Sequence, residues 1–99
     1  MTRSRTVRRQ AERDARKLAD AKWKLTLLEP GFRRDRPIAL ESASQIEPHV
    51  RGMQCPVCEV GFHVVEHVAT ADGRVVKARC PRCGKTPSIH FVLRAAVVN

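Results

Sequence analysis

The sequence predicts a small metal-bound α+β protein, in which an N-terminal α-helix precedes a three-stranded antiparallel sheet. Three observations indicate this class. Apolar residues recur at steps of three and four along residues 1–28. Alternating apolar and polar runs separated by turn residues follow between 61 and 95. Four cysteines stand in two pairs that flank the first two of these runs, which is a spacing typical of metal ligands.

The 99-residue chain has room for one domain with an appendage. It carries 19 Lys and Arg against 10 Asp and Glu, a formal net charge of +9. Residues 1–24 hold nine bases and three acids (+6), residues 25–51 four of each, and residues 52–99 six bases and three acids (+3). An excess of this sign favours polyanionic partners or anionic surfaces, and most of it lies in the first quarter of the chain.

Residues 1–28 are expected to form a basic N-terminal helix. Its apolar positions, in chain order, are Val7, Ala11, Ala15, Leu18, Ala21, Leu25 and Leu28. Pro30 ends the helix, because the residue before a proline leaves the helical region. We expect the alanine-rich first half to be solvated. The second half, which contains Trp23, is expected to pack on the rest of the protein.

Residues 29–52 are expected to link the helix to the sheet and to dock on it, because the segment is poor in glycine. Residues 37–40 predict a short strand or an arm lying on the sheet. Ser42 and Gln45 have the spacing of a capping box. Pro48 is expected to end the helical turn that this box begins.

Residues 53–99 are expected to supply the sheet. Phe62, Val64 and Val68 are predicted to share one face of the first strand. Asp72-Gly73 is a hairpin signal, and Ile89, Phe91 and Leu93 alternate along the third run. The opposite face would carry His63, His67, Lys77, Arg79, His90 and Arg94. That face is either an ordinary solvated surface or a basic surface that meets phosphate.

The cysteines form the pairs Cys55–Cys58 and Cys80–Cys83, with 21 residues between them. Two residues between paired cysteines let one tight turn point both sulfurs at one metal ion. Two such turns fill the four corners that Zn²⁺ prefers, so the site would be closed and structural rather than catalytic. His49, the nearest preceding histidine, is not needed as a ligand.

Disulfide bonds and a redox-active pair are two other interpretations of the cysteines. No secretory segment precedes the pairs, which predicts a cytoplasmic protein in which disulfides are rare. A redox C-x-x-C pair belongs to a βαβ pattern, whereas the second pair here lies between two predicted strands. Both observations favour a metal site.

The segment 53–95 resembles the zinc ribbon family. The resemblance rests on Cys55-Pro56-Val57-Cys58 and on Cys80-Pro81-Arg82-Cys83-Gly84-Lys85. It implies two zinc knuckles on a small antiparallel sheet, with the four cysteines as ligands of Zn²⁺. Gly84 suits the left-handed conformation that follows such a turn. Glu59 stands where glycine is usual in the first knuckle, at a cost of about 1–2 kcal/mol if it is left-handed.

The chain is also similar to small bacterial proteins of unassigned activity in which a basic helix precedes a ribbon. Rubredoxins use similar knuckles for iron, but the chain lacks their aromatic core, which favours zinc. The likeness to the bacterial proteins names no activity.

No catalytic constellation emerges from the sequence. No serine, histidine and acid stand at a spacing that builds a triad, and the glycines do not form a phosphate-binding loop. We therefore expect neither an enzyme nor a small-molecule substrate. No apolar run is long enough for a membrane span, so no membrane partner is expected.

The first functional hypothesis is a nucleic-acid-associated ribbon, in which arginines bind phosphates and release counterions. Its candidate contacts are Arg3, Arg5, Arg8, Arg9, Arg13, Arg16, Arg79, Arg82 and Lys85. The alternative is a protein-interaction or assembly module that binds a partner or a second copy through Trp23–Leu28, with zinc as a structural clip. A third, weaker hypothesis is zinc storage or redox sensing.

Overall fold

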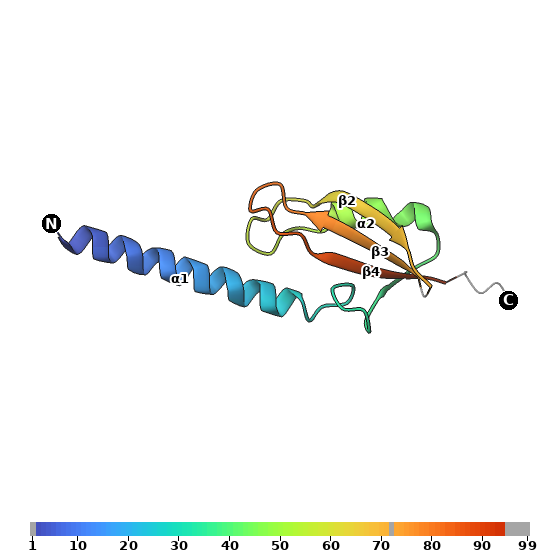
Figure 1. The fold of residues 1–99 in the computed structure, drawn as a ribbon, viewed down its shortest axis with the longest axis horizontal. Coiled ribbons are helices and arrows are strands. Elements are labelled where there is room, and N and C mark those ends of the chain that lie inside the picture. The colour runs from blue at the N-terminus through green and yellow to red at the C-terminus, as the bar shows by residue number, and fades with distance from the viewer. Residues whose placement is uncertain (1, 72, 95–99) are drawn as a thin grey trace.

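The computed structural model describes residues 2–71 and 73–94, and side chains from residue 5 onward. Helix α1 (Thr2–Thr26) is followed by strand β1 (Ile38–Leu40), a 3₁₀ turn η1 (Ala43–Gln45) and helix α2 (Ile46–Gly52). Strands β2 (His63–Ala69), β3 (Arg74–Arg79) and β4 (Ser88–Leu93) complete the chain (Figure 1). The protein is therefore small and α+β. Asp72 and residues 95–99 lie outside the described residues.

The sheet has four strands, in the order β1-β4-β3-β2, rather than the predicted three. Strands β2, β3 and β4 pair antiparallel, and β1 adds to the free edge of β4 in the parallel sense, with Ile38 opposite Phe91 and Leu40 opposite Leu93. The expected docking of the linker is thus achieved through main-chain pairing. Ile38 and Leu40 pack against the core, whereas Ala39 between them is exposed.

A β-bulge in β2 reverses the predicted faces of its second half. Val64 lies opposite Ala78, but the register shifts between Val64 and Glu66, so that His67 lies opposite the buried Val76 and Val68 opposite Val75. One extra residue turns every following side chain to the other face. The prediction that Val68 shares the core face was therefore wrong, as was the placement of His67 on the solvated face.

The predicted capping box is present at the start of the η1 turn. The Ser42 hydroxyl accepts from the Ser44 N–H, and Gln45 Oε1 accepts from the Ser42 N–H at 3.1 Å. Pro48 does not end the helical segment as predicted, because it falls in the first turn of α2, which continues to Gly52. A proline is tolerated there, since its missing N–H would have no partner within the helix.

The core lies between α2, one face of the sheet and the two cysteine loops. Its buried residues are Trp23, Ile46, Val50, Cys55, Phe62, Val76, Ala78, Cys80, Ile89 and Phe91. Ile46 and Val50 are four residues apart and therefore lie on the same face of α2. His67 on β2 is 3.5 Å from Glu47 through Nδ1, which places α2 over the same side of the sheet.

Helix α1 projects beyond the sheet and is held only near its C-terminal end (Figure 1). Trp23 is buried and its ring lies 6.3 Å from that of Phe62. The helix ends at Thr26, two residues before the predicted boundary, and turns lead to Gly31. There the Gly31 carbonyl accepts from the His90 N–H of β4. Leu18, Leu25 and Leu28, expected to pack in the second half, are exposed.

No helix in the described part of the chain is both long enough and apolar enough to cross a membrane. Helix α1 has the length, but it carries a basic or acidic residue in almost every turn.

Candidate metal centre

The first cysteine pair lies in a tight loop that enters and leaves through a short antiparallel bridge between Gln54 and Gly61. The Cys55 N–H donates to the Val60 carbonyl at 2.9 Å, and the Glu59 N–H donates to the Cys55 carbonyl at 2.9 Å. The Cys58 N–H points at Cys55 Sγ, 3.4 Å away. These three bonds fix the loop so that both sulfurs point to the same side.

The second pair repeats this arrangement position by position. The Cys80 N–H donates to the Lys85 carbonyl at 2.9 Å, and the Gly84 N–H to the Cys80 carbonyl at 3.0 Å. The Cys83 N–H points at Cys80 Sγ, 3.5 Å away. The two loops, residues 54–61 and 80–85, are called knuckle 1 and knuckle 2 below. Their common hydrogen-bond pattern explains why a C-x-x-C pair is needed in each.

Glu59 adopts the left-handed conformation, with φ of 58°, at the position where knuckle 2 has Gly84, with φ of 79°. Knuckle 1 therefore keeps the shape of knuckle 2 in spite of its non-glycine residue. Glu59 is exposed, so the side chain itself meets no steric obstacle from the core. The cost is confined to the backbone of one residue, about 1–2 kcal/mol.

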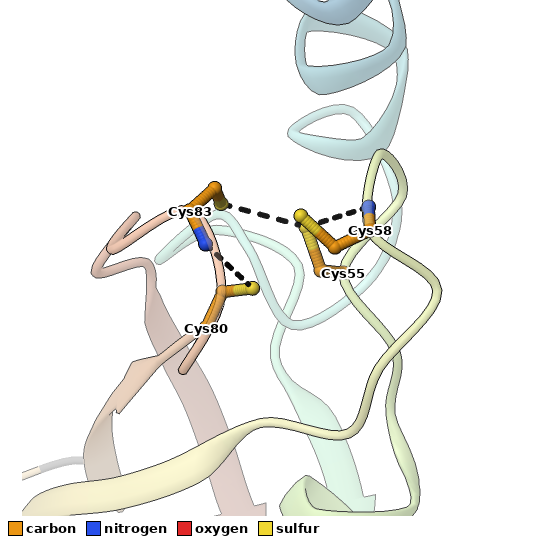
Figure 2. A group of neighbouring side chains, drawn as sticks. All are labelled: Cys55, Cys58, Cys80 and Cys83. Carbon is orange, nitrogen blue, oxygen red and sulfur yellow. Dashed lines mark hydrogen bonds between the residues drawn. The ribbon is translucent and has the colours of Figure 1, made fainter.

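The two knuckles face each other, and their four sulfurs converge on one point (Figure 2). All four Sγ atoms lie within 4.8 Å of one another, and Cys55 Sγ is 3.8 Å from Cys83 Sγ. Metal–sulfur bonds of about 2.3 Å in a tetrahedron separate the sulfurs by about 3.8 Å, whereas a disulfide bond is about 2.05 Å long. All four cysteines are free. The donor set therefore fits one tetrahedral metal ion.

The environment of the sulfurs differs between the two knuckles. Burial opposes ionisation of Cys80, but the backbone N–H groups of Cys83 and Arg82 stabilise its thiolate and lower its pKa to about 6. Burial and the neighbouring thiols raise the pKa of Cys58 to about 12, and burial also raises the pKa of Cys83. A bound cation would lower the raised pKa values of Cys58 and Cys83, because its charge stabilises every coordinating thiolate.

The histidines do not join the cysteine cluster, which contains no other metal-ligating type among the described residues. His49 lies on α2, with its ring edge-on to Phe91 at 5.8 Å between centroids. His67 pairs with Glu47, and its buried Nε2 has no hydrogen-bond partner in the part of the chain described. Both side chains belong to the contact between α2 and the sheet.

The candidate phosphate contacts fall into two groups. The exposed arginines of α1 form the first group: Arg5, Arg8, Arg9, Arg13 and Arg16. The side chain of Arg3 lies outside the described residues. The exposed residues Arg79, Arg82 and Lys85 form the second, at the end of β3 and on knuckle 2.

Knuckle 2 lies beside the C-terminal end of α1, where Trp23 is buried. A hollow of about 250 Å³ there is lined by Trp23, Leu27, Lys85, Thr86 and Pro87. Because Arg16 precedes Trp23 by seven residues, it lies about 10 Å farther along the helix axis. Lys85 therefore lies beside the docked end of α1 and the arginines of α1 lie farther along the helix, so the two basic groups do not form one compact patch.

A second basic hollow, which the sequence did not suggest, lies at the opposite end of the sheet. It has a volume of about 390 Å³ and is lined by Arg34, Arg74 and His90, together with Pro37, Thr70, Ala71 and Val75. The linker brings Arg34 beside the sheet because β1 pairs with β4. No periodicity or motif in the sequence could have indicated this juxtaposition, since it depends on the parallel pairing.

The chain was compared with known protein families, with curated proteins and with solved structures, and none of them matches it.

Proposed function

We propose that the four cysteines hold one structural zinc ion and that the chain is a zinc ribbon that binds nucleic acid through the cations of α1. The zinc ion is proposed because four Sγ atoms lie within 4.8 Å of one another. Each knuckle contributes two sulfurs, so a bound ion has no open position for substrate or water, which is the property of a structural site.

The size of the core supports a structural role for the metal. The compact part spans roughly residues 31–94, and two of its buried residues are the ligands Cys55 and Cys80. Small domains of this kind often depend on a metal or on disulfides, because their burial is limited. Zinc would close the two knuckles on each other, and its binding free energy would become folding free energy.

The metal is tested on protein purified without added zinc. Elemental analysis is expected to find one zinc ion per chain, and Cys80→Ser to remove it. Chelation should shift the emission of Trp23, the chain's single tryptophan, to longer wavelength, because Trp23 is buried beside knuckle 2. Protein without stoichiometric metal, with unchanged emission after chelation, would refute the structural site. Iron in place of zinc would refute the choice of metal alone.

The charge and exposure of α1 support the nucleic-acid part of the proposal. Between residues 5 and 17 the helix carries six bases against two acids, Glu12 and Asp14, and every side chain in this range is exposed. The helix projects from the body of the protein, so a polyanion can approach it without displacing another element (Figure 1). At 3.6 residues per turn, Arg9 and Arg16 lie within about 40° of Trp23, on the side of knuckle 2.

The mechanism would be phosphate contact with counterion release and without base readout. The chain has one tryptophan and three phenylalanines. Trp23, Phe62 and Phe91 are buried, and Phe32 packs against them. Stacking of bases on exposed aromatic side chains, the usual device of single-strand binders, is therefore not available.

The test is the salt dependence of binding to labelled duplex DNA and to structured RNA, by fluorescence anisotropy. With about four phosphates contacted, the slope of log K against log salt is expected to be roughly −3 to −4. Arg9→Gln with Arg16→Gln should weaken binding and reduce the slope by about 2. The matched control is Leu18→Gln with Leu25→Gln, which places the same residue type on the other side of α1. Affinity that does not respond to salt, or equal loss in both variants, would contradict the proposal.

The alternative function, an assembly module without nucleic-acid binding, is favoured by one observation. Leu25, Leu27 and Leu28 are 68%, 44% and 54% exposed, although Trp23 beside them is buried and unavailable to a partner. Light scattering that shows a dimer, lost in Leu25→Asp with Leu28→Asp but kept in Arg8→Glu with Arg9→Glu, would favour this alternative. In either case we propose a binding protein rather than an enzyme.

A further inference from the structure

Helix α1 carries an apolar seam on the side that faces away from the ribbon. The seam consists of Val7, Ala11, Leu18, Ala21 and Leu25, all of them exposed. Val7, Leu18 and Leu25 are 67%, 57% and 68% exposed. At 3.6 residues per turn these three lie about 140–160° around the helix from Trp23, which points into the core. No described part of the chain can therefore cover the seam while Trp23 stays docked.

The spacing of the seam is that of a coiled-coil strand. Its positions follow one another at four, seven, three and four residues, which is the alternation of a 3.5-residue repeat with one position between Ala11 and Leu18 left out. That position is Asp14, whose carboxylate accepts from Gln10 Nε2 at 3.1 Å. The aspartate interrupts the seam, so a partner would contact it most strongly over Leu18, Ala21 and Leu25.

The residues that flank the seam are basic on both sides. Arg8 and Lys22 lie on one flank, and Lys17 and Lys24 on the other, all exposed. Charged residues at such flanking positions determine the partner of a helix, because they form ion pairs with the flanking residues of the partner helix. In a second copy aligned in parallel, Lys17 would meet Lys22 of that copy. In an antiparallel copy Arg8 would meet Lys22. Both arrangements place like charges together, which disfavours self-association.

We infer that the seam binds an amphipathic helix of another protein, whose apolar stripe is flanked by Asp and Glu. Charge complementarity selects this occupant, because acidic flanks would meet Arg8, Lys17, Lys22 and Lys24 while apolar side chains cover Leu18 and Leu25. The seam and the arginines Arg9 and Arg16 lie on opposite sides of α1. This inference therefore goes beyond the proposed nucleic-acid function and is independent of it.

The test uses the full zinc-bound chain and a synthetic peptide of about four heptads, with leucine at the two core positions and glutamate at the two flanking positions of each heptad. A peptide of the same composition in scrambled order controls for simple charge attraction. The heptad peptide is expected to bind at least about tenfold more tightly than the scrambled one. Leu18→Gln with Leu25→Gln should remove this preference, and Arg9→Gln with Arg16→Gln should keep it.

Glutamine is a helix former comparable to leucine, so both double variants keep the helix. Zinc content and circular dichroism check that they do. Equal binding of the two peptides would overturn the inference, because attraction would then depend on charge alone. Loss of the preference in the arginine variant, with retention in the leucine variant, would place the peptide on the wrong face and also overturn it. A dimer in light scattering that the leucine variant abolishes would assign the seam to a second copy instead.

Discussion

Glu59 has the left-handed backbone conformation that Gly84 has at the equivalent position of knuckle 2. Both knuckles close with the same hydrogen bonds, so the arrangement of the four cysteines is set by backbone N–H groups and not by the residue types between them. The left-handed position is needed because the N–H of residue 59 or 84 must turn back to the carbonyl of the first cysteine. The cysteine cluster is thus specified by four side chains and by two backbone turns.

Replacing Glu59 by glycine is expected to stabilise the zinc-bound protein by about 1 kcal/mol, because glycine adopts a positive φ without steric cost. The measurement is urea unfolding at saturating zinc. Glu59→Ala keeps the Cβ atom and should give no comparable gain. Gly84→Ala, at φ of 79°, should destabilise by a similar amount. A gain in Glu59→Ala equal to that in Glu59→Gly would show that the side chain, not the backbone, is responsible.

Zinc affinity is expected to fall steeply on acidification. Burial raises the pKa of Cys58 to about 12 and raises that of Cys83, so both thiols must lose a proton when the metal binds at neutral pH. The pKa of Cys80 is lowered to about 6, so its thiolate is favoured in the folded state above that pH and lost as the pH falls through it.

At least two protons should therefore be released per zinc ion at about pH 7, and the apparent affinity should change by about 100-fold or more per pH unit. Calorimetry in two buffers of different ionisation enthalpy measures the proton count. Release of fewer than one proton would contradict the assignment of Cys58 and Cys83 as protonated thiols in the metal-free protein.

At the level of elements, Trp23 is the residue through which α1 docks on the rest of the protein. Ala19, Trp23 and Thr26 are the less exposed positions of the helix, and they are spaced four and three residues apart on one face. The seam residues Leu18, Ala21 and Leu25 are spaced three and four residues apart on another face. Periodicity alone favours this face as the buried one, because it carries two leucines. The ring of Trp23 instead packs near Phe62 and lines the hollow beside knuckle 2.

Trp23→Ala is expected to lower the free energy of unfolding by about 3 kcal/mol or more, because a buried aromatic side chain leaves a cavity. Leu25→Ala, at an exposed position of the same helix, should cost less than about 0.5 kcal/mol. Urea unfolding of the zinc-saturated variants, followed by circular dichroism, compares the two. A larger loss in Leu25→Ala would mean that the helix docks through the seam.

The whole molecule is elongated because only the end of α1 touches the ribbon. Its radius of gyration is 17.6 Å and its extents are 72 × 22 × 21 Å, whereas a compact protein of this length has a radius of gyration of about 13 Å. A projecting helix gives two accessible sides to one element. One side carries arginines next to knuckle 2, and the other carries the apolar seam.

Small-angle X-ray scattering at low concentration is expected to give a radius of gyration close to 17.6 Å for the zinc-bound monomer. The same value is expected for Leu18→Gln with Leu25→Gln, because Leu18 and Leu25 are 57% and 68% exposed. A value near 13 Å for the original chain, rising in that variant, would show that the seam folds back onto the ribbon.

The sequence by itself determined the cluster of four cysteines, the hairpin of β2 and β3 and the helix, because each depends on spacing within a short segment. The two C-x-x-C pairs, the turn at 70–73 and the capping box at Ser42 are local patterns of this kind. Tertiary structure decided what depends on contacts between distant segments. The parallel pairing of β1 with β4 made a fourth strand from Ile38–Leu40.

The bulge after Val64 places His67 on the core face, because strand register is set by pairing with the partner strand and not by alternation along the chain. The choice of Trp23 over the leucines as the docked residue depends on contact with Phe62, which lies 39 residues away in the sequence and which helical periodicity cannot indicate.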